Sequence, residues 1–300
     1  MLDFIHKHKS QYGVEPICKI LPIAPSTYYR QEYLKEYPEK RSKRFLHAQH
    51  YAEQIKRVWQ ESAGRYGVRK VWEQLKQEGY CVARCTVARL MQRLEIQGVW
   101  RGKNKRTTRS RDEQKRADDL VKRDFSAKHP NNLWVADFTY IQTYSGWVYT
   151  AFIIDVFSRA IVGWKVSTRM NTDMVLDALE QALLARGMPK NVIHHSDRGV
   201  QYLSIRYTNR LETANLRASV GTTGDSYDNA LAETVNGLYK TEVIEYLKSD
   251  WTGLADVELA TLHWVDWFNK KRLHSTIGYV PPFQFESMYY NKLNVLGQAA

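Results

Sequence analysis

Residues 133–141 read LWVADFTYI, a run of β-branched and aromatic residues with Asp137 at its centre. This composition is typical of a β-strand. Because side chains alternate across a strand, Val135, Asp137 and Thr139 are expected on the same side. An aspartate in such a place needs a hydrogen-bonding partner or a metal ion.

Downstream of this run, strand-like and helical patterns alternate. Strands are expected over 147–157, 160–168, 191–197 and 216–220, and helices over 171–187, 204–214, 226–247 and 253–272. Three strands followed by helix, strand, helix, strand and helix is the order of an RNase H-like α/β domain. Asn171 or Thr172 is expected to cap the first of these helices.

Two more acidic residues accompany Asp137. Asp197 ends the expected strand 191–197, and Glu233 follows it after 35 intervening residues, inside the expected helix 226–247. Carboxylates bind Mg²⁺ or Mn²⁺ because these hard cations prefer oxygen ligands. Two such ions can stabilise both the attacking and the leaving oxygen of a phosphodiester substitution. The spacing therefore makes these three acids a candidate metal site.

Other acids compete for that role. Asp155 also ends a strand and is the strongest alternative to Asp137, while Asp225 and Asp228 are expected to cap the helix that carries Glu233. His194 and His195 flank Asp197, but the spacing of a His₂-carboxylate zinc site is missing. Further acids in the region are Glu212 and Glu242.

Helical spacing places three polar residues on the same face as Glu233. Asn229 precedes it by four positions, and Asn236 and Lys240 follow it by three and seven. We expect this stripe to face metal and DNA.

The first 120 residues are helical in pattern and basic. They hold 26 Lys and Arg against 14 Asp and Glu, which accounts for the whole net charge of +12. Residues 1–43 predict a short helical segment, 44–98 a helix-turn-helix DNA-binding domain, and 99–124 a basic linker, before a catalytic core at 125–290. The alternative to the helix-turn-helix is an ordinary helical bundle, and Ser26 and Thr86 are expected helix caps. The basic side chains expected at DNA are Arg65, Arg69, Lys70, Arg89, Arg93, Lys103, Lys105 and Arg106.

Three scattered cysteines exclude a disulfide framework. Apolar runs are too short to span a bilayer, and the first residues lack the apolar stretch of a signal peptide. The sequence therefore predicts a cytoplasmic protein without a membrane partner.

Five blocks in order resemble the catalytic region of DDE transposases from bacterial insertion sequences. They are WVADFTYI, IDVFSRAIVGW, HSDRGVQY, GDSYDNALAETVNGLYKTE and WFNKKRLHSTIGYVPP. More specifically, the chain is similar to the downstream-frame protein of two-frame, copy-and-paste mobile elements, which is related to the retroviral integrase core. GRYGVRKVWEQLKQEG and ARLMQRL resemble that family's helix-turn-helix. The resemblance spans about residues 10–287.

The resemblance implies a catalytic triad of Asp137, Asp197 and Glu233 that holds two Mg²⁺ ions, with Mn²⁺ as a substitute. It implies cleavage of double-stranded DNA at the terminal inverted repeats of the element and strand transfer into target DNA. It also implies a homo-oligomer on DNA and an upstream-frame protein or fusion. Where the family often has a basic Ser-Met-Ser-Arg-Lys-Gly-like stretch, this chain has SVGTTGDSYDN, so local DNA contacts there are not carried over.

Two other functions fit the same residues. An RNase H-like nuclease would cleave without strand transfer, and a DNA-binding regulator would keep an inactive core. The basic segment WFNKKRLHSTIGYVPP either contacts DNA or packs its aromatic residues on the core, and packing with a basic rim is favoured.

Overall fold

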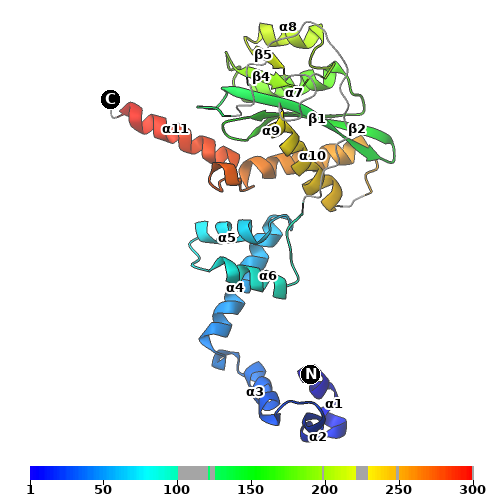
Figure 1. Ribbon diagram of the computed structural model, residues 1–300, viewed down its shortest axis with the longest axis vertical. Coiled ribbons are helices and arrows are strands. Elements are labelled where there is room, and N and C mark those ends of the chain that lie inside the picture. The colour runs from blue at the N-terminus through cyan, green and yellow to red at the C-terminus, as the bar shows by residue number, and fades with distance from the viewer. Residues whose placement is uncertain (101–120, 122–125, 198, 221–228, 248–249, 299–300) are drawn as a thin grey trace.

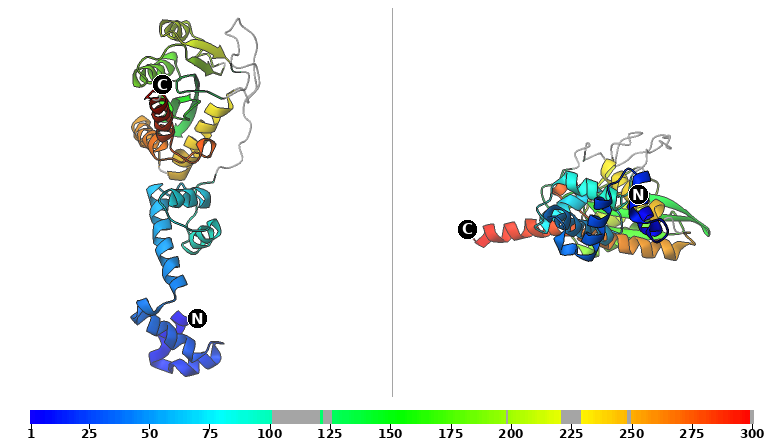
Figure 2. Two further views of the ribbon diagram at one scale, coloured as in Figure 1. Left: turned by 90° about the vertical axis from the view of Figure 1, so that its left-hand side faces the viewer. Right: turned by 90° about the horizontal axis from the view of Figure 1, so that it is seen from below.

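The computed structural model describes residues 1–100, 121, 126–197, 199–220, 229–247 and 250–298. Its elements form three bodies that follow one another along the chain (Figure 1). A small helical body lies at one end, a second helical body lies in the middle, and a sheet covered by helices lies at the other end. Figure 2 shows the same succession from a second side. No helix among the described residues is both long and apolar enough to cross a bilayer.

The first body consists of α1 (Leu2–Tyr12), α2 (Val14–Ile20) and α3 (Pro25–Glu36). They pack around Ile5, Ile17, Cys18 and Tyr28. The prediction that Ser26 caps α3 is wrong, because Pro25 already occupies the first turn, where a missing N–H costs nothing. A short 3₁₀ turn, η1 (Pro38–Lys40), leads to the second body.

The second body contains α4 (Lys43–Glu61), α5 (Val68–Gln77) and α6 (Arg84–Arg93). Ser42 caps α4 by accepting a hydrogen bond from the Phe45 amide at 3.3 Å. The three helices share an apolar core, formed by Ile55, Val58, Val71, Leu75, Val87, Leu90 and Met91. Thr86 was expected to cap the last helix, but α6 begins two residues earlier, at Arg84.

The third body is built on a sheet whose described strands run in the order β3-β2-β1-β4-β5. The strands are β1 (Leu133–Thr143), β2 (Gly146–Asp155), β3 (Ile161–Ser167), β4 (Ile193–Ser196) and β5 (Arg217–Val220). The first three pair antiparallel, whereas β4 and β5 continue the sheet parallel to β1. This arrangement confirms the predicted mixed α/β core, preceded by helices.

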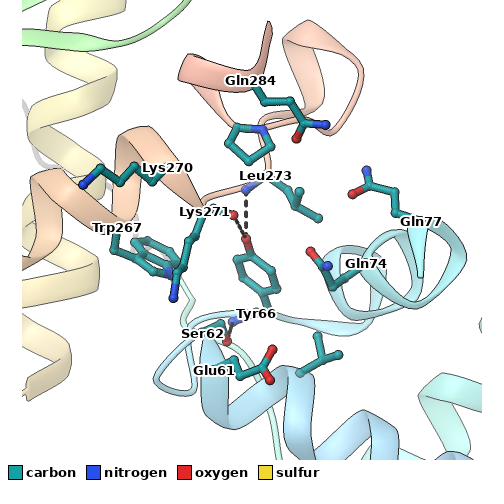
Figure 3. A pocket seen from close by; sticks show the side chains of 12 residues that line it. Glu61, Ser62, Tyr66, Gln74, Gln77, Trp267, Lys270, Lys271, Leu273 and Gln284 are labelled. Atoms are coloured by element: carbon teal, nitrogen blue, oxygen red, sulfur yellow. Dashed lines mark hydrogen bonds between the residues drawn. The ribbon is translucent and has the colours of Figure 1, made fainter. Parts of the chain in front are cut away.

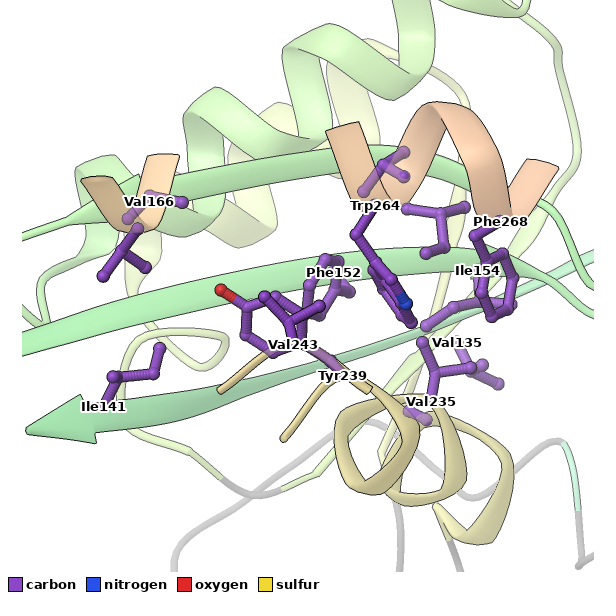
Figure 4. Packing of buried hydrophobic residues seen from close by; sticks show 14 of the residues in the cluster. Val135, Ile141, Phe152, Ile154, Val166, Val235, Tyr239, Val243, Trp264 and Phe268 are labelled. Carbon is purple, nitrogen blue, oxygen red and sulfur yellow. The ribbon is translucent and has the colours of Figure 1, made fainter. Parts of the chain in front are cut away.

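Helices cover both faces of the sheet. One face packs on α7 (Thr172–Ala185) and α8 (Ile205–Thr213) through Trp134, Ile153 and Leu179. The other packs on α9 (Ala230–Tyr239) and α10 (Leu254–Lys270). Figure 4 shows Phe152, Tyr239 and Trp264 interlocked in this second layer.

The helix that carries Glu233 does not run on as one regular α-helix. It changes after Tyr239 into a π-helical turn, η2 (Lys240–Glu245). The wider turn brings Thr241, Glu242 and Val243 into the interior. After α10 come a short 3₁₀ turn, η3 (Ser275–Ile277), and α11 (Pro282–Gln298), which projects away from the sheet (Figure 2).

Candidate active site

The parallel pairing of β1 with β4 brings two of the predicted acids together. Ala136 lies opposite Ser196, the last residue of β4. Asp137 is the next residue on β1 and Asp197 directly follows β4, and neighbouring strands are only about 4.8 Å apart. The two aspartates therefore lie side by side where β4 ends.

Helix α9 is pinned to the same place by two amides. Asn229 Nδ2 donates to the Ala136 carbonyl oxygen at 2.9 Å. Asn236 Nδ2 donates to Asp137 Oδ2 at 2.8 Å. Glu233 lies between these amides on the same helical face, so it belongs to the face that meets β1. Its side chain is exposed, in the first turn of α9.

Backbone amides orient the two aspartates. The Phe138 amide donates to Asp137 Oδ1 at 2.8 Å, and the Gly199 amide donates to Asp197 Oδ1 at 3.0 Å. Each carboxylate is thus held in a defined rotamer before any ligand arrives.

The electrostatics of this site oppose the accumulation of negative charge. Burial, together with the charges of Asp197 and Glu233, raises the pKa of Asp137 to about 8, against the opposing effect of the hydrogen bonds from Phe138 and Asn236. Burial also raises the pKa of Asp197. Both carboxylates would ionise more readily beside a cation.

The chemistry of the donor set suits an oxygen-seeking divalent cation. Besides the carboxylates, it includes the buried Oδ1 atoms of Asn229 and Asn236, to which no described residue donates a hydrogen bond. Within the described ranges, no three His, Cys, Asp or Glu side chains already converge closely enough to share an ion.

The competing residues have structural partners instead. Asp155 is fully buried and accepts hydrogen bonds from the Asn131 amide at 2.7 Å and from the amide and hydroxyl of Ser158 at 2.9 and 3.0 Å. His194 and His195 are also buried. His194 Nε2 lies 3.1 Å from the hydroxyl of Tyr207, and His195 Nδ1 lies 2.9 Å from that of Ser219. The predicted capping acids at 225 and 228 lie outside the described residues.

The predicted DNA contacts lie in different surroundings. Arg89 and Arg93 are exposed on α6, and Arg69 is exposed on α5. Asn229 and Asn236 are buried against β1, where they meet the sheet rather than solvent. The predicted contacts Lys103, Lys105 and Arg106 lie outside the described residues.

Arg65 and Lys70 were expected at DNA but lie at the junction between the second body and the sheet-bearing body. Arg65 Nε donates to the Glu242 carbonyl oxygen at 3.1 Å, and its guanidinium lies 4.8 Å from the centroid of the Trp267 ring. The Lys70 ammonium lies 5.1 Å from that of the Tyr66 ring. This placement uses both side chains within the protein.

Tyr66 is the centre of that junction, and the sequence pattern did not single it out. Its hydroxyl donates to the Lys271 carbonyl oxygen at 3.0 Å and accepts from the Leu273 amide at 2.8 Å (Figure 3). Beside it, the buried Arg272 guanidinium donates to the Glu242 carboxylate at 2.6 Å. The partners are more than 200 residues from Tyr66 in the chain, so no local spacing could reveal them. The segment after α10 thus packs on the helices of the second body, which is the alternative favoured from the sequence, and Lys271 is exposed.

Comparison with known families finds two kinds of domain. A model of an HTH-like domain matches residues 47–104, and two models of an integrase core domain match residues 127–226 and 214–282.

The chain is also similar to named proteins along nearly its whole length. It is 54% identical over 290 residues to the transposase for insertion sequence element IS629 of Shigella sonnei, and the match covers 97% of each chain. It is 51% identical to the putative transposase for IS986/IS6110 of Mycobacterium tuberculosis H37Rv, over 90% of this chain and 97% of the relative. It is 32% identical to transposase InsF for insertion sequence IS3A of Escherichia coli K12, over 95% and 97%.

Solved structures match at lower similarity. The catalytic core domain of HTLV-2 integrase in complex with magnesium is 18% identical, with a TM-score of 0.42, over 53% of this chain and 97% of that one. A chain of the simian T-cell lymphotropic virus intasome is 13% identical, with a TM-score of 0.46, over 77% and 74%.

Proposed function

The chain belongs to the transposases of insertion sequences that join an HTH-like domain to an integrase core, and from this premise we propose that Asp137, Asp197 and Glu233 are its catalytic carboxylates. The observation that carries the proposal is the pairing of Ala136 with Ser196 beneath a helix pinned by Asn229 and Asn236. These contacts bring the separate sequence motifs to one end of the sheet.

The three carboxylates would hold two Mg²⁺ ions, or Mn²⁺ in their place. When bound, such ions stabilise the charge on the attacking and leaving oxygens of a phosphodiester substitution. The donor set supports this assignment, because it consists of oxygen atoms and because the raised pKa of Asp137 signals a site short of positive charge.

The protein's own groups contribute positioning. The Phe138 and Gly199 amides hold one oxygen of Asp137 and one of Asp197, and Asn236 holds the second oxygen of Asp137. Fixed ligands spare the site the reorganisation that a flexible one undergoes in the transition state. Glu233, the exposed member, would complete the set as substrate and ions arrive.

The substrate of this proposal is double-stranded DNA: the terminal repeats of the element first and target DNA second. Arg69, Arg89 and Arg93 present exposed positive charge on the helix-turn-helix body, where they would contact phosphates. Lys240, on the Glu233 face, would contact the DNA near the cleaved end. The relatives are named transposases. An enzyme of this kind that pairs two element ends would act as more than one copy on DNA. An upstream-frame protein, separate or fused, would be a further partner.

A cleavage and strand-transfer assay tests the assignment. Purified full chain is mixed with labelled duplexes that carry the element's ends, in Mg²⁺ or Mn²⁺. Asp197→Asn is expected to lower both activities by at least about 100-fold, because a ligand to the stabilising charge is lost. Asp173→Asn serves as the control, since Asp173 is an exposed acid on α7 that pairs with Arg206.

Each other outcome has a defined meaning. Ordinary strand transfer by Asp197→Asn would overturn the assignment. Cleavage without joined products would favour an RNase H-like nuclease. Binding without chemistry by the wild type would call for the same assay on the upstream fusion or would favour a regulatory role.

A further inference from the structure

Two large aromatic side chains lie exposed on the β1–β2 hairpin, close to the proposed triad. Tyr140 is 50% exposed and Trp147 is 49% exposed. Their rings pack edge to face, with centroids 5.4 Å apart and planes at 80°. The register pairs Gln142 with Trp147, so that Tyr140 and Trp147 are diagonal neighbours on the same face of the hairpin.

A lysine from the catalytic helix completes this surface. The Lys240 ammonium lies 4.6 Å from the centroid of the Tyr140 ring. Lys240 follows α9 directly, seven residues after Glu233, on the face that Asn236 pins to Asp137. We call Tyr140, Trp147 and Lys240 the aromatic platform.

The platform lies within reach of a DNA strand bound at the acids. Tyr140 is three residues beyond Asp137 on β1, about 10 Å along the strand, and alternation directs its side chain to the opposite face of the sheet. A DNA strand that reaches both places therefore passes the part of β1 that lies beyond its pairing with β4. Stacked nucleotides rise about 3.4 Å each, so this separation equals about three nucleotides. Lys240 lies near both the platform and the acids. Burial lowers the pKa of Lys240, and the charge of Asp137 opposes this change because it is close enough to act on the ammonium.

The hairpin that presents the platform is held in place at its tip. The amides of Tyr144 and Ser145 donate to the carbonyl oxygens of Trp251 and Thr252 at 2.9 and 3.1 Å. The Thr143 hydroxyl donates to the Gly146 carbonyl oxygen across the turn at 2.7 Å. A tethered tip keeps the aromatic rings oriented without a ligand, which lowers the ordering cost of binding.

We infer that the aromatic platform stacks an unpaired nucleobase of the DNA strand whose phosphate lies at the triad. This inference rests on the proposed function, and it adds that the enzyme takes a frayed rather than a fully paired end. Aromatic faces bind bases of any sequence by stacking, and a nearby cation adds attraction for the phosphate and the ring. The Lys240 ammonium beside the rings attracts an anionic strand, whereas a second copy of the chain carries a net charge of +12, so charge favours a nucleic acid.

Binding to two duplexes tests the inference. Full-length protein in the Asp197→Asn background, which removes cleavage, is titrated with an element end that is fully paired and with the same end carrying three mismatched terminal pairs. A 2-aminopurine at the unpaired end reports stacking by loss of its fluorescence. The protein with an unaltered platform is expected to bind the mismatched end more tightly than the paired end and to quench the 2-aminopurine fluorescence.

Variants of the platform should remove that preference. Trp147→Ala or Tyr140→Ala is expected to weaken binding of the mismatched end by about 10-fold, with little effect on the paired end, and to restore the fluorescence. Trp147→Phe should keep most of the preference. Tyr144→Ala is the matched control, because Tyr144 is an exposed aromatic residue of the same hairpin and lies outside the platform.

Three results would overturn the inference. The first is equal affinity of the unaltered protein for both ends, and the second is an unchanged preference for the mismatched end in the alanine variants. The third is the loss of an oligomer by the alanine variants, measured by light scattering, while they keep that preference. The last result would assign the face to a second copy. Cleavage by the wild-type enzyme is measured separately, so absent preference beside normal cleavage defeats this inference alone. Absent metal-dependent cleavage with preference intact defeats the proposed function instead.

Discussion

Asn236 is the side chain that connects α9, the helix that carries Glu233, to Asp137. Its Nδ2 donates to Asp137 Oδ2, while its Oδ1 is buried and receives no hydrogen bond from the described residues. An amide in this position holds the carboxylate through its nitrogen and keeps a buried oxygen that receives no hydrogen bond. Groups that orient a ligand in this way commonly change metal affinity by 10- to 100-fold when they are removed.

Asn236→Ala is therefore expected to raise the Mg²⁺ concentration that gives half-maximal cleavage by about 10-fold or more, because Asp137 loses its orienting bond. Activity should recover partly at saturating Mn²⁺. Metal titrations of the cleavage rate measure this shift. Thr234→Ala, an exposed change on the same helix, is expected to leave the metal requirement unaltered. An unchanged metal requirement in Asn236→Ala would show that the amide does not position the ligand.

At the scale of elements, the distance between β3 and α7 depends on a residue without a side chain. A Cβ added at Gly163 would lie 2.2 Å from the Ala178 carbonyl oxygen and 2.9 Å from the Ala182 Cβ. The backbone oxygen cannot move aside without displacing the helix, so glycine is what permits the close approach. The same face of the sheet supports β1, and hence the end at which Asp137 lies.

We expect Gly163→Ala to lower the free energy of unfolding by about 1–3 kcal/mol, the usual cost of overpacking a core. Chemical denaturation followed by circular dichroism measures it. Lys165→Ala on the same strand removes only an exposed ion pair with Asp177 and should change stability little. Equal stability of the two variants would mean that β3 and α7 separate at no cost.

The change from α9 to the π-helical turn η2 is a second feature at the scale of elements. A regular helix was expected through residue 247, but the π-helical turn buries Glu242, where Trp264 Nε1 and the Arg272 guanidinium donate to its carboxylate. These hydrogen bonds hold the buried charge, and the pKa of Glu242 is lowered although burial acts to raise it. The helix that carries Glu233 is thus joined to α10 and, through Arg65, to the helix-turn-helix body.

At the scale of the whole molecule, Lys70 makes the junction between these bodies sensitive to pH. Burial, together with the Arg272 charge, lowers its pKa from 10.5 to about 7, and the Glu242 charge opposes the change. Burial together with the Arg272 and Lys70 charges also lowers the pKa of His274, to about 2, so that His274 stays neutral over the working range. Tyr66, whose ring lies under the ammonium, completes the surroundings.

The sign of the effect follows from proton counting. Between pH 7 and 10.5 the unfolded chain keeps a proton on Lys70 that the folded chain has lost, so stability from this group rises with pH, by at most about 1.4 kcal/mol per pH unit. Lys70→Met keeps an unbranched side chain that is one heavy atom shorter and removes the charge. The variant should melt above the wild type at pH 6, and this advantage should shrink towards pH 9. Thermal unfolding at a series of pH values measures the difference, and a difference that does not vary with pH would contradict the assignment.

The order of strands and helices could be predicted from the sequence, because alternation and helical spacing are local properties. The candidate acids could be named in the same way, since each lies in a motif with a distinct local pattern. The pairing of Ala136 with Ser196, the buried role of Asp155, and the use of Arg65 and Lys70 inside the protein were decided only by the tertiary structure. Each of these depends on contacts between residues distant in the chain, where burial and hydrogen-bond partners, rather than residue type, determine what a charged side chain does.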